Sequence, residues 1–146
     1  AGIESPGLSC SPAIGEMVAG MVADILHLEE NPDFDGSRKG IVNPAALPTE
    51  QRRALIASQP AYGNIICRCE TVSEGEILDA IRRTPGARSV DGVKRRTRAG
   101  MGRCQGGFCS PKVMEILARE LDIPLSQVTK SGKGSEWILG SNKDRL

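Results

Sequence analysis

Four of the five cysteines form two close pairs, and this spacing constrains the fold and chemistry of the chain more than any other feature. Cys67 and Cys69 are separated by one residue, and Cys104 and Cys109 follow 34 residues later with four residues between them. Paired cysteines are typical of metal or redox sites in proteins that are not secreted. Residues 1–12 lack the basic start and apolar stretch of a secretion signal, which favours a metal centre over disulfides.

Two kinds of metal centre use four thiolates, namely iron–sulfur clusters and structural zinc sites. Zinc ligand pairs are usually separated by about two to four residues, so the single residue between Cys67 and Cys69 is tight for one tetrahedral ion. A binuclear cluster gives adjacent ligands more room. We therefore expect a [2Fe–2S] cluster on Cys67, Cys69, Cys104 and Cys109, with zinc as a substitute at the same thiolates and inert or disulfide-bonded thiols as a weaker alternative.

The pattern of apolar residues predicts a mainly α-helical chain. A helix is expected over 11–28, with Ser11 as its N-cap and Pro12 in its first position. A second short helix is expected over about 49–58, with Thr49 as its cap. Three further helices are expected around the cysteines, over 71–84, 89–97 and 110–121. A short strand is expected over 64–67. The first of these three begins with a capping box at Thr71–Glu74.

The surroundings of the cysteines are suited to an anionic centre. Both cysteine pairs are expected at helix N-termini, where unpaired backbone N–H groups favour negative charge. Glycines in the loop before the second pair allow close approach of backbone amides to sulfur: Gly100, Gly102, Gly106 and Gly107. Basic residues also precede this pair or lie within the first one: Arg68, Lys94, Arg95, Arg96, Arg98 and Arg103. They form either a solvated face or a positive field that raises the reduction potential of the cluster.

Composition bears on partners and location. The net charge of +1 and the presence of only four aromatic residues argue against nucleic acid as a partner. No apolar run approaches the roughly 20 residues that span a bilayer, so we expect no transmembrane segment. A cytoplasmic location follows as an expectation, with any membrane contact made through a larger complex.

Residues 64–111 resemble the BFD-like [2Fe–2S] domain. The segments that carry the resemblance are IICRCETVSEGEI and VKRRTRAGMGRCQGGFC, and the second is most similar to the version found at the C-terminus of FAD-dependent glycerol-3-phosphate dehydrogenases and related oxidoreductases. The resemblance implies a small fold of short helices, similar to a helix-turn-helix. It also implies that Cys67, Cys69, Cys104 and Cys109 are the cluster ligands.

The N-terminal segment GIESPGLSCSPAIGEMVAGM resembles the closing segment of the FAD-binding domain in the same dehydrogenases. The resemblance implies that Gly7, Leu8 and Ser9 lie nearest the flavin in a full-length parent. The Gly-x-Gly-x-x-Gly dinucleotide-binding motif does not occur in this chain, so the chain alone is not expected to hold FAD. The implied organisation is a remnant of the FAD-binding domain (1–30), a linker with a short helix (31–61), a BFD-like domain (62–121) and a C-terminal tail (122–146).

These observations together predict an electron-transfer module of a larger FAD-dependent dehydrogenase, inactive alone. Its expected partners are the FAD and substrate domain of the parent and a redox partner or electron acceptor. The alternatives are a zinc-stabilised domain that docks subunits and a redox-sensing or cluster-delivery module. Cys10 is expected to be a small buried residue or a neighbour of the flavin in the parent, His27 to have a structural role, and Trp137 to belong to the core or an interface.

Overall fold

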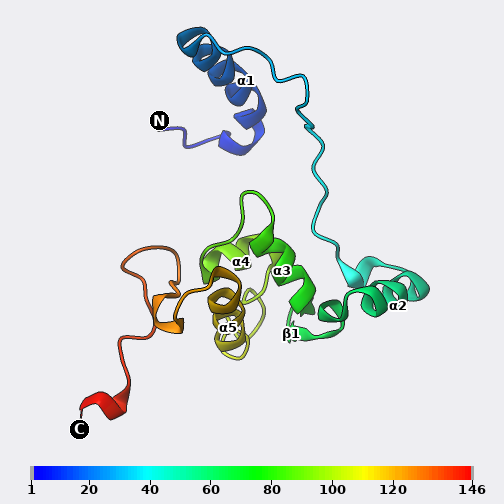
Figure 1. Cartoon of the computed structure of the whole chain (residues 1–146), viewed down its shortest axis with the longest axis vertical. Helices are drawn as coiled ribbons and strands as arrows, with labels where there is room; N and C mark the ends of the chain where they lie inside the picture. Colours follow the sequence, from blue (N-terminus) through cyan, green and yellow to red (C-terminus); the bar gives the residue numbers. More distant parts are fainter. Residues whose placement is uncertain (1, 146) are drawn as a thin grey trace. The chain divides into compact units, whose positions relative to one another are not determined.

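The computed structural model describes residues 2–145, which form two units, one ending at Arg38 and the other beginning at Lys39. Helices predominate, in agreement with the sequence, and one two-stranded sheet accompanies them among the described residues (Figure 1). The five α-helices are α1 (Gly7–Leu26), α2 (Thr49–Ser58), α3 (Glu74–Arg82), α4 (Val90–Thr97) and α5 (Ser110–Leu121). The strands are β1 (Ile65–Cys67) and β2 (Val72–Ser73). Short 3₁₀ turns cover Pro44–Ala46, Pro60–Gly63, Leu125–Gln127 and Asn142–Arg145.

Helix α1 begins at Gly7, so the expected N-cap at Ser11 is wrong. Pro12 lies inside the helix and has no N–H to donate to the carbonyl of Leu8. The Ser11 hydroxyl donates to that carbonyl instead, at 2.8 Å. The Ser11 hydroxyl therefore replaces the backbone hydrogen bond that Pro12 cannot make, and the helix continues through the Ser-Pro pair. The same pair commonly starts a helix.

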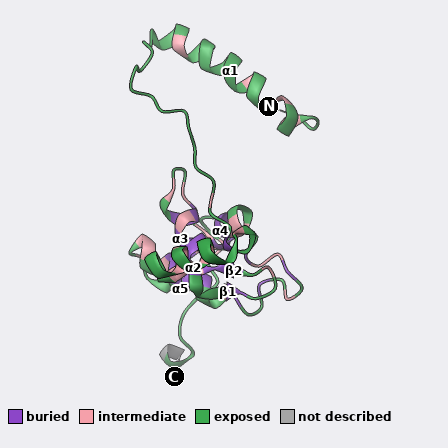
Figure 2. Ribbon diagram, turned by 90° about the vertical axis from the view of Figure 1, so that its right-hand side faces the viewer, coloured by how far each residue is buried: buried purple, intermediate pink, exposed green. Residues whose placement is uncertain are grey.

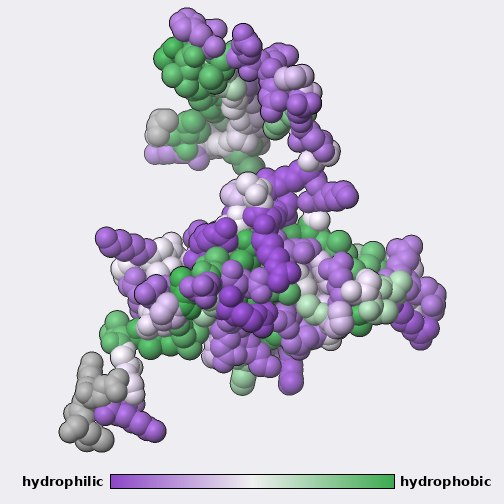
Figure 3. Space-filling model, in the orientation of Figure 1, coloured by the Kyte–Doolittle hydropathy of each residue, from purple (hydrophilic) through white to green (hydrophobic). Residues whose placement is uncertain are grey.

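No residue of α1 is buried within its own unit, and large apolar side chains such as Ile25 are mostly exposed (Figures 2 and 3). By length and composition α1 is able to cross a membrane, which corrects the expectation that no segment approaches that limit. A single helix of this kind is weak evidence for a membrane span, because helices from the core of soluble proteins pass the same test.

The β1–β2 hairpin leads into α3 through a capping box. Ser73 is the N-cap, its hydroxyl accepts from the Glu76 amide at 3.3 Å, and the Glu76 carboxylate accepts from the Ser73 amide at 2.8 Å. The expected box at Thr71 was two residues too early. Thr71 lies in the tight turn between the strands, with a φ of 54°. Strand β2 follows this turn, so the helix begins only after β2.

The core of the second unit lies between α3, α4 and α5 (Figure 2). Ile77, Ile81, Val93, Val113 and Leu117 are among its most deeply buried large side chains and come from all three helices, and Val128 joins them from the segment after α5. Helix α4 is capped by Ser89, which accepts from the Gly92 amide at 3.1 Å. The bounds of α5 agree with the sequence prediction, whereas Thr49 is the first residue of α2 and not its cap. This core holds the hairpin and the start of α5 beside each other.

Candidate metal centre

All four paired cysteines line one surface depression of about 470 Å³. Cys67 ends β1, Cys69 lies in the turn that follows, Cys104 belongs to the glycine-rich loop between α4 and α5, and Cys109 is the N-cap residue of α5. The fold thus brings together two pairs that are separated by 34 residues in the sequence. All five cysteines, Cys10 included, are free thiols.

The four thiols divide into an inner and an outer pair. Cys67 and Cys109 form the inner pair and are 1% and 2% exposed, whereas Cys69 is exposed and Cys104 is half-buried. The sulfur atoms of the outer pair, Cys69 and Cys104, are 3.6 Å apart. Each pair therefore combines one cysteine of the hairpin with one of the loop and helix that follow α4.

The donor set of this depression is four thiols. Thiolates are the usual ligands of [2Fe–2S] clusters, so the residues fit such a cluster.

Backbone amides favour the thiolate form of Cys104. The amide of Phe108 makes the largest contribution to a lowered pKa of Cys104, and the Cys69 thiol and the amides of Gly106 and Gly107 add to it. Hydrogen bonds of this type also tune the potential of a bound cluster. Burial raises the pKa of Cys109 to about 11, with further contributions from the nearby Cys67 and Cys104 thiols. Metal binding would have to displace that proton.

Only one cysteine pair lies at a helix N-terminus. Cys109 directly precedes α5, as expected. Cys67 and Cys69 lie in the hairpin, with Cys69 four residues before the N-cap Ser73, so their expected place at the start of a helix is wrong. Strand β2, which the sequence analysis did not predict, separates this pair from α3.

The basic residues of α4 do not gather at the cysteines. Arg96 donates to the carbonyls of Gly92 and Pro85, at 3.0 and 3.3 Å, and Arg98 pairs with Glu70 at 2.8 Å. Of the six basic residues singled out in the sequence, Arg68 lines the depression, and Lys94, Arg95, Arg96, Arg98 and Arg103 do not. The expected positive field therefore cannot come from the whole basic stretch.

Four residues that line the depression were not predicted from the sequence as part of the site: Ile65, Ile66, Phe108 and Lys112. Phe108 is 85% exposed although it lies directly before a buried cysteine. Its place in the sequence, between Gly107 and Cys109, is a signal that could have identified it. A bulky apolar residue inside a glycine-rich loop of metal ligands has few neighbouring side chains to pack against, so its exposure at the site can be expected.

The remaining candidate residues lie elsewhere. Gly7, Leu8 and Ser9 form the first turn of α1 in the N-terminal unit. Cys10 is half-buried there, and His27 ends α1 in a left-handed conformation. Trp137 lines a second depression of about 490 Å³, together with Met114 of α5.

A small helical domain with four convergent thiols at its surface defines a cysteine-ligated metal-binding domain. More specifically, residues 65–119 match the family described as the BFD-like [2Fe-2S] binding domain, and this part of the chain is such a domain. No solved structure matches the chain.

The relatives are much longer proteins. Over its whole length the chain is 48% identical to a glycerol 3-phosphate dehydrogenase of Caloramator mitchellensis, of which it spans 31%. It is 44% identical to hydrogen cyanide synthase subunit HcnB of Pseudomonas aeruginosa, over 47% of this chain and 15% of that protein. It is 32% identical to anaerobic glycerol-3-phosphate dehydrogenase subunit A1 of Haloferax volcanii, over 68% of this chain and 17% of that protein.

Proposed function

We propose that this chain is the electron-transfer part of a larger FAD-dependent dehydrogenase of the glycerol-3-phosphate dehydrogenase type, which relays electrons from the flavin to a redox partner. The observation that carries the proposal is the convergence of four thiols at one surface depression of a BFD-like domain. A [2Fe–2S] cluster, when bound, supplies one-electron redox chemistry.

Cys67, Cys69, Cys104 and Cys109 are the proposed ligands. The inner pair ties the bound group to the core, because Cys67 and Cys109 are buried among residues of α3 and α5. The outer pair leaves the group accessible, because Cys69 is exposed and Cys104 is only half-buried. A carrier that exchanges electrons with other proteins needs both a fixed site and an accessible edge.

The N-terminal unit is proposed to belong to the missing flavin domain. The relative from Caloramator mitchellensis matches this unit as well as the BFD-like domain. Helix α1 buries none of its residues within its own unit, and Met17, Met21 and Ile25 are exposed apolar residues on it. In the full-length parent we propose that this helix packs against the flavin domain, with Gly7, Leu8 and Ser9 nearest the cofactor.

A reductive titration tests the carrier function. The anaerobically purified chain, loaded with its cluster, is titrated with dithionite, reoxidised, and titrated again while EPR spectra are recorded. We expect uptake of about one electron per chain and an unchanged signal over several cycles. Loss of iron at the first oxidation would favour a redox-sensing or cluster-delivery role and would contradict the proposal.

A further inference from the structure

Two arginines of the BFD-like domain differ from the others in their contacts. Among the nine arginines within residues 65–119, seven form an ion pair with a carboxylate or donate to a backbone carbonyl: Arg82, Arg83, Arg88, Arg95, Arg96, Arg98 and Arg119. Arg68 and Arg103 have no such partner within the described part of the chain, and both are exposed. Each directly precedes a cysteine of the outer pair, Cys69 or Cys104. Arg68 lines the cysteine depression, whereas Arg103 does not line it and is next to the site only through its chain neighbour Cys104.

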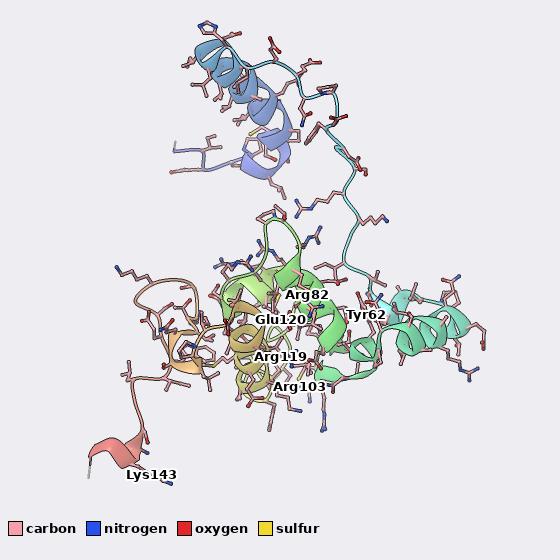
Figure 4. All side chains as sticks on the ribbon, in the orientation of Figure 1. Tyr62, Arg82, Arg103, Arg119, Glu120 and Lys143 are labelled. Carbon is pink, nitrogen blue, oxygen red and sulfur yellow. The ribbon has the colours of Figure 1, made fainter. Side chains whose placement is uncertain are left out.

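Lys112 adds a third cation to the same surface. It lies in the first turn of α5, lines the cysteine depression, and has no carboxylate partner among the described side chains. Glu70 pairs with Arg98 at 2.8 Å, and Glu74 and Glu115 line a neighbouring depression that Lys112 also borders. Among the residues that line the cysteine depression itself, Arg68 and Lys112 are charged and none is acidic. The rim of the cysteine depression therefore carries excess positive charge. Figure 4 shows Arg103 at the end of the domain where β1 and α5 lie.

Apolar side chains also line the cysteine depression. Phe108 is 85% exposed and Ile65 is 40% exposed, and both line the cysteine depression. The Phe108 backbone amide contributes to the site through its contact with Cys104, but the side chain has no packing role. An apolar centre inside a polar or charged rim is the usual anatomy of a protein–protein interface. We call the surface formed by Ile65, Phe108, Arg68, Arg103 and Lys112 the cysteine face.

We propose that the cysteine face docks an acidic surface of a separate redox protein, which exchanges electrons at the edge formed by Cys69 and Cys104. This inference rests on the proposed electron-transfer function and specifies its partner. Positive groups around the electron exit attract an anionic partner and speed the encounter, an effect that salt screens. Phe108 and Ile65 then supply the apolar contact that holds the encounter complex.

Two oxidants of opposite charge test the sign of the field at the exit. The cluster-loaded chain is reduced anaerobically and mixed in a stopped-flow instrument with ferricyanide or with tris(phenanthroline)cobalt(III). We expect ferricyanide to react faster at low salt, with the advantage shrinking as salt is added. The double variant R68E/R103E should lose about tenfold in the ferricyanide rate and gain in the cobalt rate. The control K133E reverses one charge, as K112E does, in the exposed loop between Thr129 and Glu136, away from the cysteine depression, and should change neither rate.

A binding measurement tests docking itself. Oxidised flavodoxin is used as an acidic probe and oxidised cytochrome c as a basic one, and their affinity for the oxidised chain is measured by biolayer interferometry. We expect salt-sensitive binding of flavodoxin, weakened about tenfold by R68E/R103E or by F108A, and no binding of cytochrome c. If R68E/R103E fails to load the cluster, K112E replaces it in both experiments. The midpoint potential of each variant is measured by EPR titration. A variant whose potential is unchanged but whose affinity for flavodoxin is lower has lost binding, and not the electrostatic field at the cluster.

The outcomes are distinct. A chain that loads a cluster and cycles one electron, but reacts faster with the cationic oxidant or responds equally to K133E, overturns the docking proposal and leaves the carrier function intact. A chain that binds cytochrome c more tightly than flavodoxin likewise overturns the docking proposal and leaves the carrier function intact. A chain that binds no cluster overturns both proposals.

Discussion

Gly102 packs directly on Cys69. A β-carbon at residue 102 would lie far inside van der Waals contact with the β-carbon of Cys69, and Glu70 lies nearby at 3.3 Å. The glycine-rich loop and the hairpin turn therefore touch through their backbones, and this contact sets the position of one ligand relative to the loop that carries Cys104.

The first prediction concerns this contact. The G102A substitution should push the loop away from Cys69, lower the iron content of the purified chain and destabilise it by about 1–3 kcal/mol, as overpacking usually does. Iron analysis and thermal unfolding measure the two effects. Gly20 lies inside α1 and faces open space where a β-carbon would be added, so G20A is the matched control. Full iron content in G102A would contradict the account.

The second prediction concerns the free thiols after the cluster has been removed with a chelator. The lowered pKa of Cys104 means that its thiolate forms below the ordinary value of 9.0, whereas burial keeps Cys109 protonated up to about 11. Near neutral pH, iodoacetamide should therefore label Cys104 well before Cys109, and labelling of Cys104 should rise with pH at lower values than that of Cys109. Mild oxidation should link Cys69 to Cys104, whose sulfur atoms are 3.6 Å apart.

Peptide mass spectrometry identifies the labelled and linked residues. Circular dichroism of the metal-free chain before labelling shows whether the helices persist. Equal labelling of Cys104 and Cys109 in a chain that keeps its helices would count against the division into an inner and an outer pair.

The third prediction concerns the capping box of α3. Ser73 is fully buried, and its hydroxyl donates to Glu76 at 2.7 Å while accepting from the Glu76 amide. The S73A variant should lower the free energy of unfolding by about 1–2 kcal/mol, because it removes the cap and leaves part of a buried carboxylate unpaired. Ser126 is exposed, so S126A is the control and should be neutral. An unchanged melting temperature in S73A would show that the box does not stabilise the hairpin–helix junction.

The fourth prediction concerns Arg119, which joins two helices. It donates to Glu74 of α3 at 2.7 Å and lies 3.4 Å from Glu120, which itself pairs with Arg82 (Figure 4). The R119A variant should lose about 0.5–1 kcal/mol of stability at low salt and less at high salt, because Arg119 is more than half exposed and its pairs are screened. R53A, which breaks an exposed pair within α2, should cost less. Denaturant unfolding at two salt concentrations measures both, and a loss in R119A that does not depend on salt would argue against ion pairing.

Much of the fold was accessible from the sequence because its signals are local. The spacing of Val113, Met114 and Leu117, with Ser110-Pro111 in front, was sufficient to place α5. Ser89 likewise marked the start of α4. Such caps and apolar stripes act within a few residues and need no tertiary context.

The wrong predictions of helix starts arose where one local sequence signal is compatible with two structures. Ser11-Pro12 is also compatible with the interior of a helix when the serine hydroxyl takes over the missing hydrogen bond. The motif Thr71–Glu74 overlaps the true capping box at Ser73–Glu76, and only the pairing of β2 with β1 decides between them. The cysteine spacing predicted the site, but its inner and outer pairs, and the separation of the cysteines from the basic residues of α4, depend on tertiary packing.

The most direct test of the central claim is the metal and acid-labile sulfide content of anaerobically purified protein, measured together with its UV–visible and EPR spectra. The account requires about two irons and two sulfides per chain and an EPR signal that appears on reduction. One zinc per chain without sulfide, in protein produced with ample iron, would contradict it and would favour a zinc-stabilised docking domain.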